Sequence, residues 1–317
     1  MTETALLRLL PPVLRARDFR LYTQGGRRFV DLWQNGGRAI LGHTPPNLLR
    51  ELKNTANRGL MSPFPHPLEQ RFTKALSALF PGKAFRIYSD DASLRHALES
   101  AGFPAPDAIP DPAFPPAGKP GDSSGEGASP RITLWRPFLD TPAPGTAGSS
   151  SPKPSAEAEG RSSPPDTSVP AVRHAESVPL LIPILPWPLS PQVLVIEKNL
   201  APVFLPSDIV NPLILAAATR GIYDLIAAPQ RGAMVFPKIN KALYGGAPGK
   251  KWRRRGIYLT LNADRGSHPD MDSYAALFRR FLEGGFLLPP SPHYPLILPG
   301  TLSPGEEAKL AELLGSN

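Results

Sequence analysis

The most concentrated chemistry in this chain is a run of cationic side chains around one tryptophan. Residues 250–255 read KKWRRR. Such a run could neutralise the phosphates of a nucleic acid while Trp252 stacks on a base. The other interpretation is a solvated turn that leads into a strand over residues 256–261, which read GIYLTL. A single six-residue run without the pattern of a nucleic-acid-binding fold favours the turn, so we do not expect a nucleic acid as partner.

Several catalytic classes are excluded by residue types and spacing. The chain has no cysteine, which excludes disulfides, thiolate catalysis and cysteine-bound zinc and fits a reducing cytoplasm. The six histidines do not have the spacing of a metal site, and His43 and His66 stand in turn motifs that look structural. No nucleophile elbow, Walker loop or dinucleotide fingerprint occurs. Arg27 and Arg38 could hold a substrate carboxylate in a bidentate manner, but two surface charges would explain them equally well.

Several short motifs must position any site, and they follow one another along the chain. A strand over residues 27–31 (RRFVD) precedes a glycine turn and the segment ILGHTPP, and HPLE at residues 66–69 opens a helix. Later, NPLILAAA at residues 211–218 starts a helix with Asn as cap and Pro in the first turn. GFLLPPSP follows from residue 285, and Ser303 and Glu306 form a capping box before the last helix.

In this order the motifs resemble the class III (glutamate-1-semialdehyde-type) aminotransferases, which use pyridoxal phosphate. The resemblance covers about residues 18–103 and 205–317, with the family's centre shortened. It implies an α/β fold of the fold-type I aminotransferase kind, with a mixed, mostly parallel sheet between flanking helices and a small C-terminal α+β domain. It also implies pyridoxal phosphate as cofactor if the family activity survives, and a homodimer formed through the N-terminal segment.

The family's chemistry needs a phosphate cradle at a helix N-terminus, an imine-forming lysine and an aspartate against the pyridinium nitrogen. Ser89, Asp90 and Asp91 stand at the cradle, and only Ser89 matches the family. Two carboxylates would repel a doubly charged phosphate, so we expect Asp90 or Asp91 simply to cap the following helix.

The lysine and the aspartate have only substitutes here. Apart from Lys119 and Lys153 in the proline-rich segment, Lys198 is the one lysine between the cradle and the helix that begins after Asn211. It is equally explained as a solvated lysine at a strand end. Glu197 is the nearest substitute for the aspartate. The sequence therefore predicts an aminotransferase-like protein that has lost transaminase activity and has a regulatory or binding role. The alternatives are an active pyridoxal-phosphate aminotransferase or aminomutase, and an interaction protein.

The interaction hypothesis rests on the centre of the chain. Of the 42 prolines, many lie between Pro104 and Pro179, among serine, glycine and alanine. This composition predicts disorder, since it cannot bury enough apolar surface to offset the entropy of ordering. A polyproline-binding partner is the expected ligand. Residues 131–140 (RITLWRPFLD) interrupt the segment. They form either a strand docked on the body or an apolar binding motif within a loop.

The expected domain division follows from this composition. Residues 1–103 form the N-terminal segment and the first part of the α/β body, and residues 104–178 form the disordered insertion. Residues 179–245 complete the body, and residues 246–317 form the small C-terminal domain. The chain contains no uninterrupted apolar run of about 18 residues, so we expect no membrane span. The N-terminus lacks the pattern of a signal peptide. We expect a cytoplasmic protein.

Overall fold

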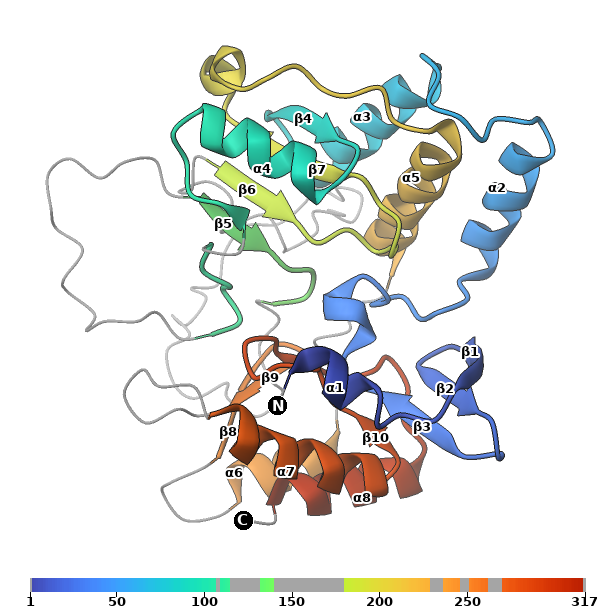
Figure 1. Ribbon diagram of the computed structural model, residues 1–317, viewed down its shortest axis with the longest axis vertical. Coiled ribbons are helices and arrows are strands. Elements are labelled where there is room, and N and C mark those ends of the chain that lie inside the picture. The colour runs from blue at the N-terminus through green and yellow to red at the C-terminus, as the bar shows by residue number, and fades with distance from the viewer. Residues whose placement is uncertain are drawn as a thin grey trace, which may run out of the picture.

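The computed structural model describes residues 2–106, 109–114, 132–139, 180–228, 236–245, 251–261 and 270–315. The helices are α1 (Glu3–Leu7), α2 (Pro46–Ala56), α3 (Leu68–Leu79), α4 (Asp91–Ser100), α5 (Pro212–Ala227), α6 (Pro237–Tyr244), α7 (Met271–Glu283) and α8 (Pro304–Gly315), with 3-10 turns η1 (Gln34–Gly37) and η4 (Lys198–Val203). The strands are β1 (Val13–Arg17), β2 (Arg20–Thr23), β3 (Arg28–Asp31), β4 (Ala84–Tyr88), β5 (Ile132–Trp135), β6 (Leu180–Pro183), β7 (Gln192–Ile196), β8 (Trp252–Arg255), β9 (Tyr258–Leu261), β10 (Phe286–Leu287) and β11 (Leu296–Ile297). Figure 1 shows β4 to β7 with α2 to α5 in the upper part and the other labelled helices and strands in the lower part.

The upper sheet has the strand order β4-β7-β6-β5, and it is mixed. The strands β5 and β6 are parallel, whereas β7 is antiparallel to both of its neighbours. The sequence predicted a mixed, mostly parallel sheet, and the described strands are mixed but mainly antiparallel. The short connection over residues 184–191 explains the difference, because a parallel pair needs a crossover of a dozen or more residues.

The first and last parts of the chain share one sheet, whose order is β1-β2-β3-β10. Val30 pairs with Phe286 in the parallel contact between β3 and β10. The third sheet, β11-β9-β8, is attached to the same region, since the Ile297 N–H donates to the Leu32 carbonyl at 2.8 Å. The strands over residues 27–31 and 256–261 therefore belong to one folded body, as the sequence analysis expected.

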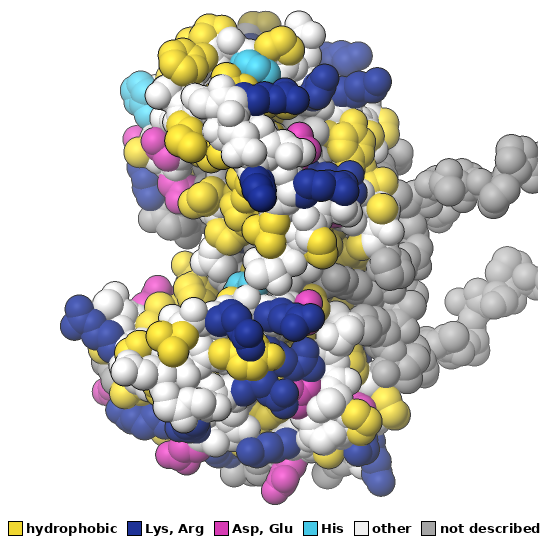
Figure 2. Space-filling view, turned by 90° about the vertical axis from the view of Figure 1, so that its right-hand side faces the viewer, with side chains coloured by type: hydrophobic (Ala, Val, Ile, Leu, Met, Phe, Trp, Pro, Cys, Tyr) yellow, Lys and Arg dark blue, Asp and Glu magenta, His cyan; other side chains and the backbone are white. Residues whose placement is uncertain are grey.

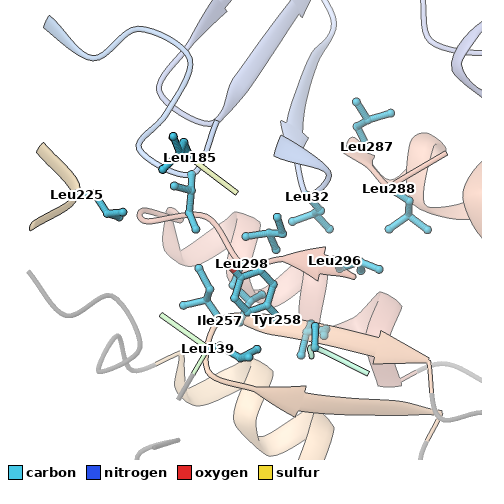
Figure 3. Close-up of a cluster of buried hydrophobic side chains, with 14 of the residues drawn as sticks. Leu32, Leu139, Leu185, Leu225, Ile257, Tyr258, Leu287, Leu288, Leu296 and Leu298 are labelled. Atoms are coloured by element: carbon cyan, nitrogen blue, oxygen red, sulfur yellow. The ribbon is translucent and has the colours of Figure 1, made fainter. Parts of the chain in front are cut away.

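One hydrophobic core runs from the upper into the lower part of the molecule. Leu185 and Leu225 from the upper elements belong to the same buried cluster as Ile257 and Leu298 below, and Figure 3 shows these side chains together with Tyr258. Helices α2 and α3 both pack against α5. The two parts bury common apolar surface, so their stabilities are coupled.

The predicted helix ends are confirmed by their hydrogen bonds. The Asn211 side chain accepts a bond from the Leu213 N–H at 2.8 Å and so caps α5, with Pro212 as its first residue. At α8 the capping box is complete, since the Ser303 N–H donates to Glu306 Oε2 at 2.8 Å and the Glu306 N–H to Ser303 Oγ at 3.3 Å. These ends depend on local sequence alone, which is why they were predictable.

The segment over residues 131–140 contains a strand docked on the body. Ile132 to Trp135 pair in parallel with Leu180 to Pro183. Residues 109–114 are also packed, with Ile109 6% and Ala113 3% exposed, although they fall within the segment for which we predicted disorder. The apolar side chains among these prolines find a place on the body, so the ordered chain extends beyond residue 104. Residues 107–108, 115–131 and 140–178 of the predicted disordered insertion lie outside the described residues.

The basic run does not form the solvated turn that we predicted. Trp252 to Arg255 are the strand β8, and Trp252 is 4% exposed against the ring of Phe281, at 6.1 Å between centroids. Arg254 is half-buried and donates to the Gly256 carbonyl at 2.8 Å. Side chains alternate between the faces of a strand, so the tryptophan points inward and Arg253 outward. A buried tryptophan cannot stack on a base.

Candidate functional site

Ligands of open α/β sheets bind outside the carboxyl ends of the strands, and the cradle candidates lie at such an end. Ser89 and Asp90 follow β4, and α4 begins at Asp91. Asp90 caps α4, because its Oδ1 accepts a bond from the Ser93 N–H at 2.8 Å. This backbone bond lowers the pKa of Asp90. The expectation that one of the two aspartates caps the helix is confirmed, and Asp91 is exposed in its first turn.

A third carboxylate, Asp208, occupies the donors of Ser89. Asp208 Oδ2 accepts the Ser89 N–H at 2.8 Å and the Ser89 hydroxyl at 3.0 Å. The segment that carries it is held beside β4, since the Ile87 N–H donates to Ser207 Oγ at 3.0 Å and the Asp208 N–H donates to the Ile87 carbonyl at 2.8 Å. Asp208 was not predicted from the sequence, because 119 residues separate it from Ser89 and no spacing rule connects them.

Lys198 and Glu197 lie at the other end of the sheet. In the antiparallel register of β4 and β7, Tyr88 pairs with Gln192 and Ala84 with Ile196. Ser89 therefore lies near the start of β7, whereas Lys198 lies two residues past its end. The four residue steps between the paired ends correspond to about 14 Å. Glu197 forms an ion pair with Lys83, and Lys198 is exposed.

The carboxyl ends of β5 and β6 carry a cation and an apolar residue. Arg136, which follows β5, has a side chain only 2% exposed. It donates to both carboxylate oxygens of Asp111, at 2.7 and 2.5 Å, and to the Gly36 carbonyl at 2.9 Å. Burial works against its charge, but the neighbouring Asp111 outweighs this and raises the pKa of Arg136. Ile184 follows β6. Neither of the two residues that follow these strands is a carboxylate, and the Asp111 carboxylate is paired with Arg136.

Of the two arginines considered for carboxylate binding, Arg38 faces this edge of the sheet. Its guanidinium donates to Gln192 Oε1 at 3.2 Å. Burial lowers the pKa of Arg38, and the charge of Asp91 offsets this only in part. Arg27 lies elsewhere, with its guanidinium 4.9 Å from the centre of the Phe29 ring and bonded to the Leu282 carbonyl at 3.3 Å.

His43, the first of the two histidines of the turn motifs, makes a structural contact, as its sequence context indicated. His43 Nε2 lies 2.9 Å from Asp31 Oδ2, and Asp31 also accepts the Trp33 N–H and the Gln34 N–H, both at 2.9 Å. Asp31 thereby fixes a turn in which Gln34 has φ 48°, a left-handed value that few residues adopt. Within the described residues, no group of three or more metal-ligating side chains gathers. No helix among them is long and apolar enough to cross a membrane.

Comparison with known proteins supports an aminotransferase relationship over parts of the chain. No family model matches. The chain is 40% identical over 80 residues to an uncharacterized protein of Borreliella burgdorferi, which is 25% of this chain and 30% of that protein. It is 31% identical over 100 residues to a glutamate-1-semialdehyde 2,1-aminomutase of Sorangium cellulosum, covering 31% and 23% of the two chains. The matched part thus spans less than a third of each relative.

The fold extends the likeness over nearly the whole chain. An ω-transaminase from Sphaerobacter thermophilus superposes with a TM-score of 0.64, at 10% sequence identity, over 96% of this chain and 90% of that enzyme. The architecture is thus that of the fold-type I aminotransferases. Taken with the local sequence matches, the fold supports a relationship to the class III aminotransferases.

Proposed function

We propose that this protein has lost transaminase activity and that it acts as a binding or regulatory protein on an aminotransferase-like fold. The observation that carries the proposal is the opposite placement of the two residues that would have to cooperate. Ser89 lies beside the start of β7, and Lys198 lies beyond its end. A lysine about 14 Å along the sheet, with its side chain in solvent, does not share a site with the cradle.

The electrostatics of the cradle also disfavour pyridoxal phosphate. A phosphate arriving at Ser89 would meet Asp208 in direct contact with the N–H and the hydroxyl that it needs. Asp90 holds the Ser93 N–H in the same way. A doubly charged phosphate and these carboxylates repel each other. The helix dipole of α4 is already used by the aspartates.

Among the described residues, the strand ends next to the cradle carry no side chain that matches the ring of the cofactor either. A pyridoxal ring acts as an electron sink when a carboxylate stabilises its protonated nitrogen. The corresponding strand ends carry Arg136, which is cationic, and Ile184, which is apolar. The residues present therefore do not fit pyridoxal phosphate, and we assign no catalytic step to it.

The test is a titration of the purified protein with pyridoxal phosphate, followed by borohydride reduction and peptide mapping. We expect weak absorption in the imine band and scattered, substoichiometric labelling of exposed lysines. The control is Lys198→Ala, which should leave the labelling yield unchanged apart from that one peptide. Stoichiometric labelling at Lys198 that is lost in the variant would overturn the proposal.

A second experiment asks whether the cradle backbone survives. Replacing Asp90, Asp91 and Asp208 by Gly, Thr and Asn removes all three carboxylates and should raise the affinity for pyridoxal phosphate. Asp208→Asn alone should give part of the gain, because it releases the Ser89 donors without touching the cap of α4. Unchanged affinity in the triple variant would mean that residues 89–93 are not a degenerate cradle.

The local match to named aminomutases favours one alternative, an active pyridoxal-phosphate aminotransferase or aminomutase, and the labelling experiment distinguishes it. The other alternative is an interaction protein that presents residues 104–178 to a polyproline-binding partner. It concerns mainly residues that the structure does not describe. A homodimer and a cytoplasmic location likewise stay predictions.

A further inference from the structure

A pocket of about 270 Å³ lies between the end of α2 and the start of α3. It is lined by residues of both helices and of their connection. The lining includes neither the cradle residues nor Glu197 and Lys198. Figure 2 faces the side of the molecule on which α2 lies in Figure 1, and Lys and Arg side chains gather on both the upper and the lower part of this face. The volume suits a small metabolite rather than a drug-sized ligand.

The wall from α2 contains a hydroxyl side chain. Glu51, Asn54 and Thr55 all line the pocket, and their spacing places them on one face of the helix. Thr55 is 5% exposed as a whole residue. Its hydroxyl is a donor that a ligand in the pocket would use.

The rest of the lining is rich in cationic donors. Arg58 and Arg71 line the pocket, and neither forms an ion pair with a carboxylate in the described part of the chain. The His66 ring contributes a further donor. Its Nδ1 accepts the Leu68 N–H at 3.1 Å, so in the neutral ring the proton is on Nε2.

From these residues we propose that the pocket binds a small anionic molecule through a phosphate or carboxylate group. Arg58 and Arg71 hold its oxygens, since guanidinium groups match both anions in a bidentate manner. The Thr55 hydroxyl and the His66 Nε2–H complete the donor set. Glu51, the one carboxylate in the lining, accepts from a hydroxyl or ammonium group at the other end of the ligand. This site does not include the cradle, and it does not depend on whether the protein binds pyridoxal phosphate.

The test is calorimetric titration of the full chain with inorganic phosphate, phosphoethanolamine and succinate. We expect saturable 1:1 binding of phosphate, of succinate or of both, and the stronger of the two identifies the class of anion. Arg58→Gln and Arg71→Gln should each weaken binding about tenfold or more. Thr55→Val, which keeps the side-chain shape, should weaken it about threefold or more. Glu51→Gln should weaken phosphoethanolamine relative to inorganic phosphate.

The matched control is Arg50→Gln, which removes the same charge from the exposed face of α2 outside the pocket. It should bind as the wild type does, and circular dichroism should show that all variants are folded. The proposal is overturned if no probe binds saturably below about 50 mM, a range in which even weak anion sites fill. It is equally overturned if Arg58→Gln and Arg71→Gln match Arg50→Gln. Neither result depends on borohydride labelling of lysines, so this proposal and the proposed function fail separately.

Discussion

Removing the charge of Asp111 should destabilise the protein far more than its position in a proline-rich segment suggests. Asp111 holds Arg136 through two hydrogen bonds, and the arginine side chain is 2% exposed. Breaking a buried ion pair by removing one partner costs about 3–5 kcal/mol, because an uncompensated charge stays behind. The Gly36 carbonyl at 2.9 Å and the Tyr258 ring at 5.4 Å still stabilise the guanidinium. For Asp111→Asn we therefore expect the lower end, about 3 kcal/mol.

Equilibrium unfolding in guanidinium chloride measures this loss as a shift of the midpoint at an unchanged slope. Asp18→Asn is the matched control, because Asp18 pairs with Arg17 at 3.9 Å and both side chains are more than half exposed. It should change the free energy of unfolding by less than about 1 kcal/mol. The double variant Asp111→Ala with Arg136→Met should recover much of the loss, since it leaves no buried charge.

An equal and small effect of Asp111→Asn and Asp18→Asn would refute the reasoning. It would mean that residues 109–114 do not pack on the body and that water reaches Arg136. The prediction of disorder from composition would then hold for the whole of residues 104–130.

Three further predictions follow from single contacts. Burial opposes the charge of Glu306, but its bonds to Arg20 and Ser303 outweigh this and lower its pKa to about 2. The stability that this carboxylate contributes above about pH 4.5 should therefore be lost as the pH falls toward 2. Glu306→Gln should flatten this part of the plot of unfolding free energy against pH. Gly256→Ala should strongly lower the melting temperature, because a Cβ would lie 2.1 Å from the Phe138 carbonyl oxygen. Gly25 also has a positive φ (89°) but faces open space, so Gly25→Ala should lower the melting temperature only slightly. Residues 180–317 expressed alone lack β3, the partner of β10, and should aggregate, so a cooperative melt of that fragment would contradict the shared core.

The sequence predicts the local features of this fold well, because their causes lie within a few residues. Asn211 caps α5 through the Leu213 N–H, and Ser303 and Glu306 bond each other's N–H groups. The strand of residues 131–140 was one of two open interpretations, and its pairing with β6 depends on a strand almost 50 residues away. The burial of Trp252 could have been predicted from the alternation of side chains between the faces of a strand. The high density of charge in residues 250–255 suggested a turn instead.

The candidate site was less predictable, because the decisive contacts join distant segments. Lys198 stands in the expected interval of sequence, yet the antiparallel register of β7 with β4 carries it away from Ser89. That register follows from the short connection between β6 and β7, which a residue-by-residue comparison with the family does not reveal. Asp208 reaches Ser89 across 119 residues, and only the fold brings them together.

If the protein has lost transaminase activity as proposed, these contacts also explain why a single substitution should not restore it. The connection over residues 184–191, which enters β7 beside Ser89, contains no lysine. Three polar side chains around it already have partners in the protein: Ser89 has Asp208, Arg136 has Asp111, and Arg38 has Gln192. A phosphate or a pyridinium ring would have to displace these partners, and an abandoned buried partner costs about 1–3 kcal/mol or more if charged. The carboxyl edge of the sheet is thus stabilised by its own side chains, and an active site there would require a new lysine together with the removal of Asp208.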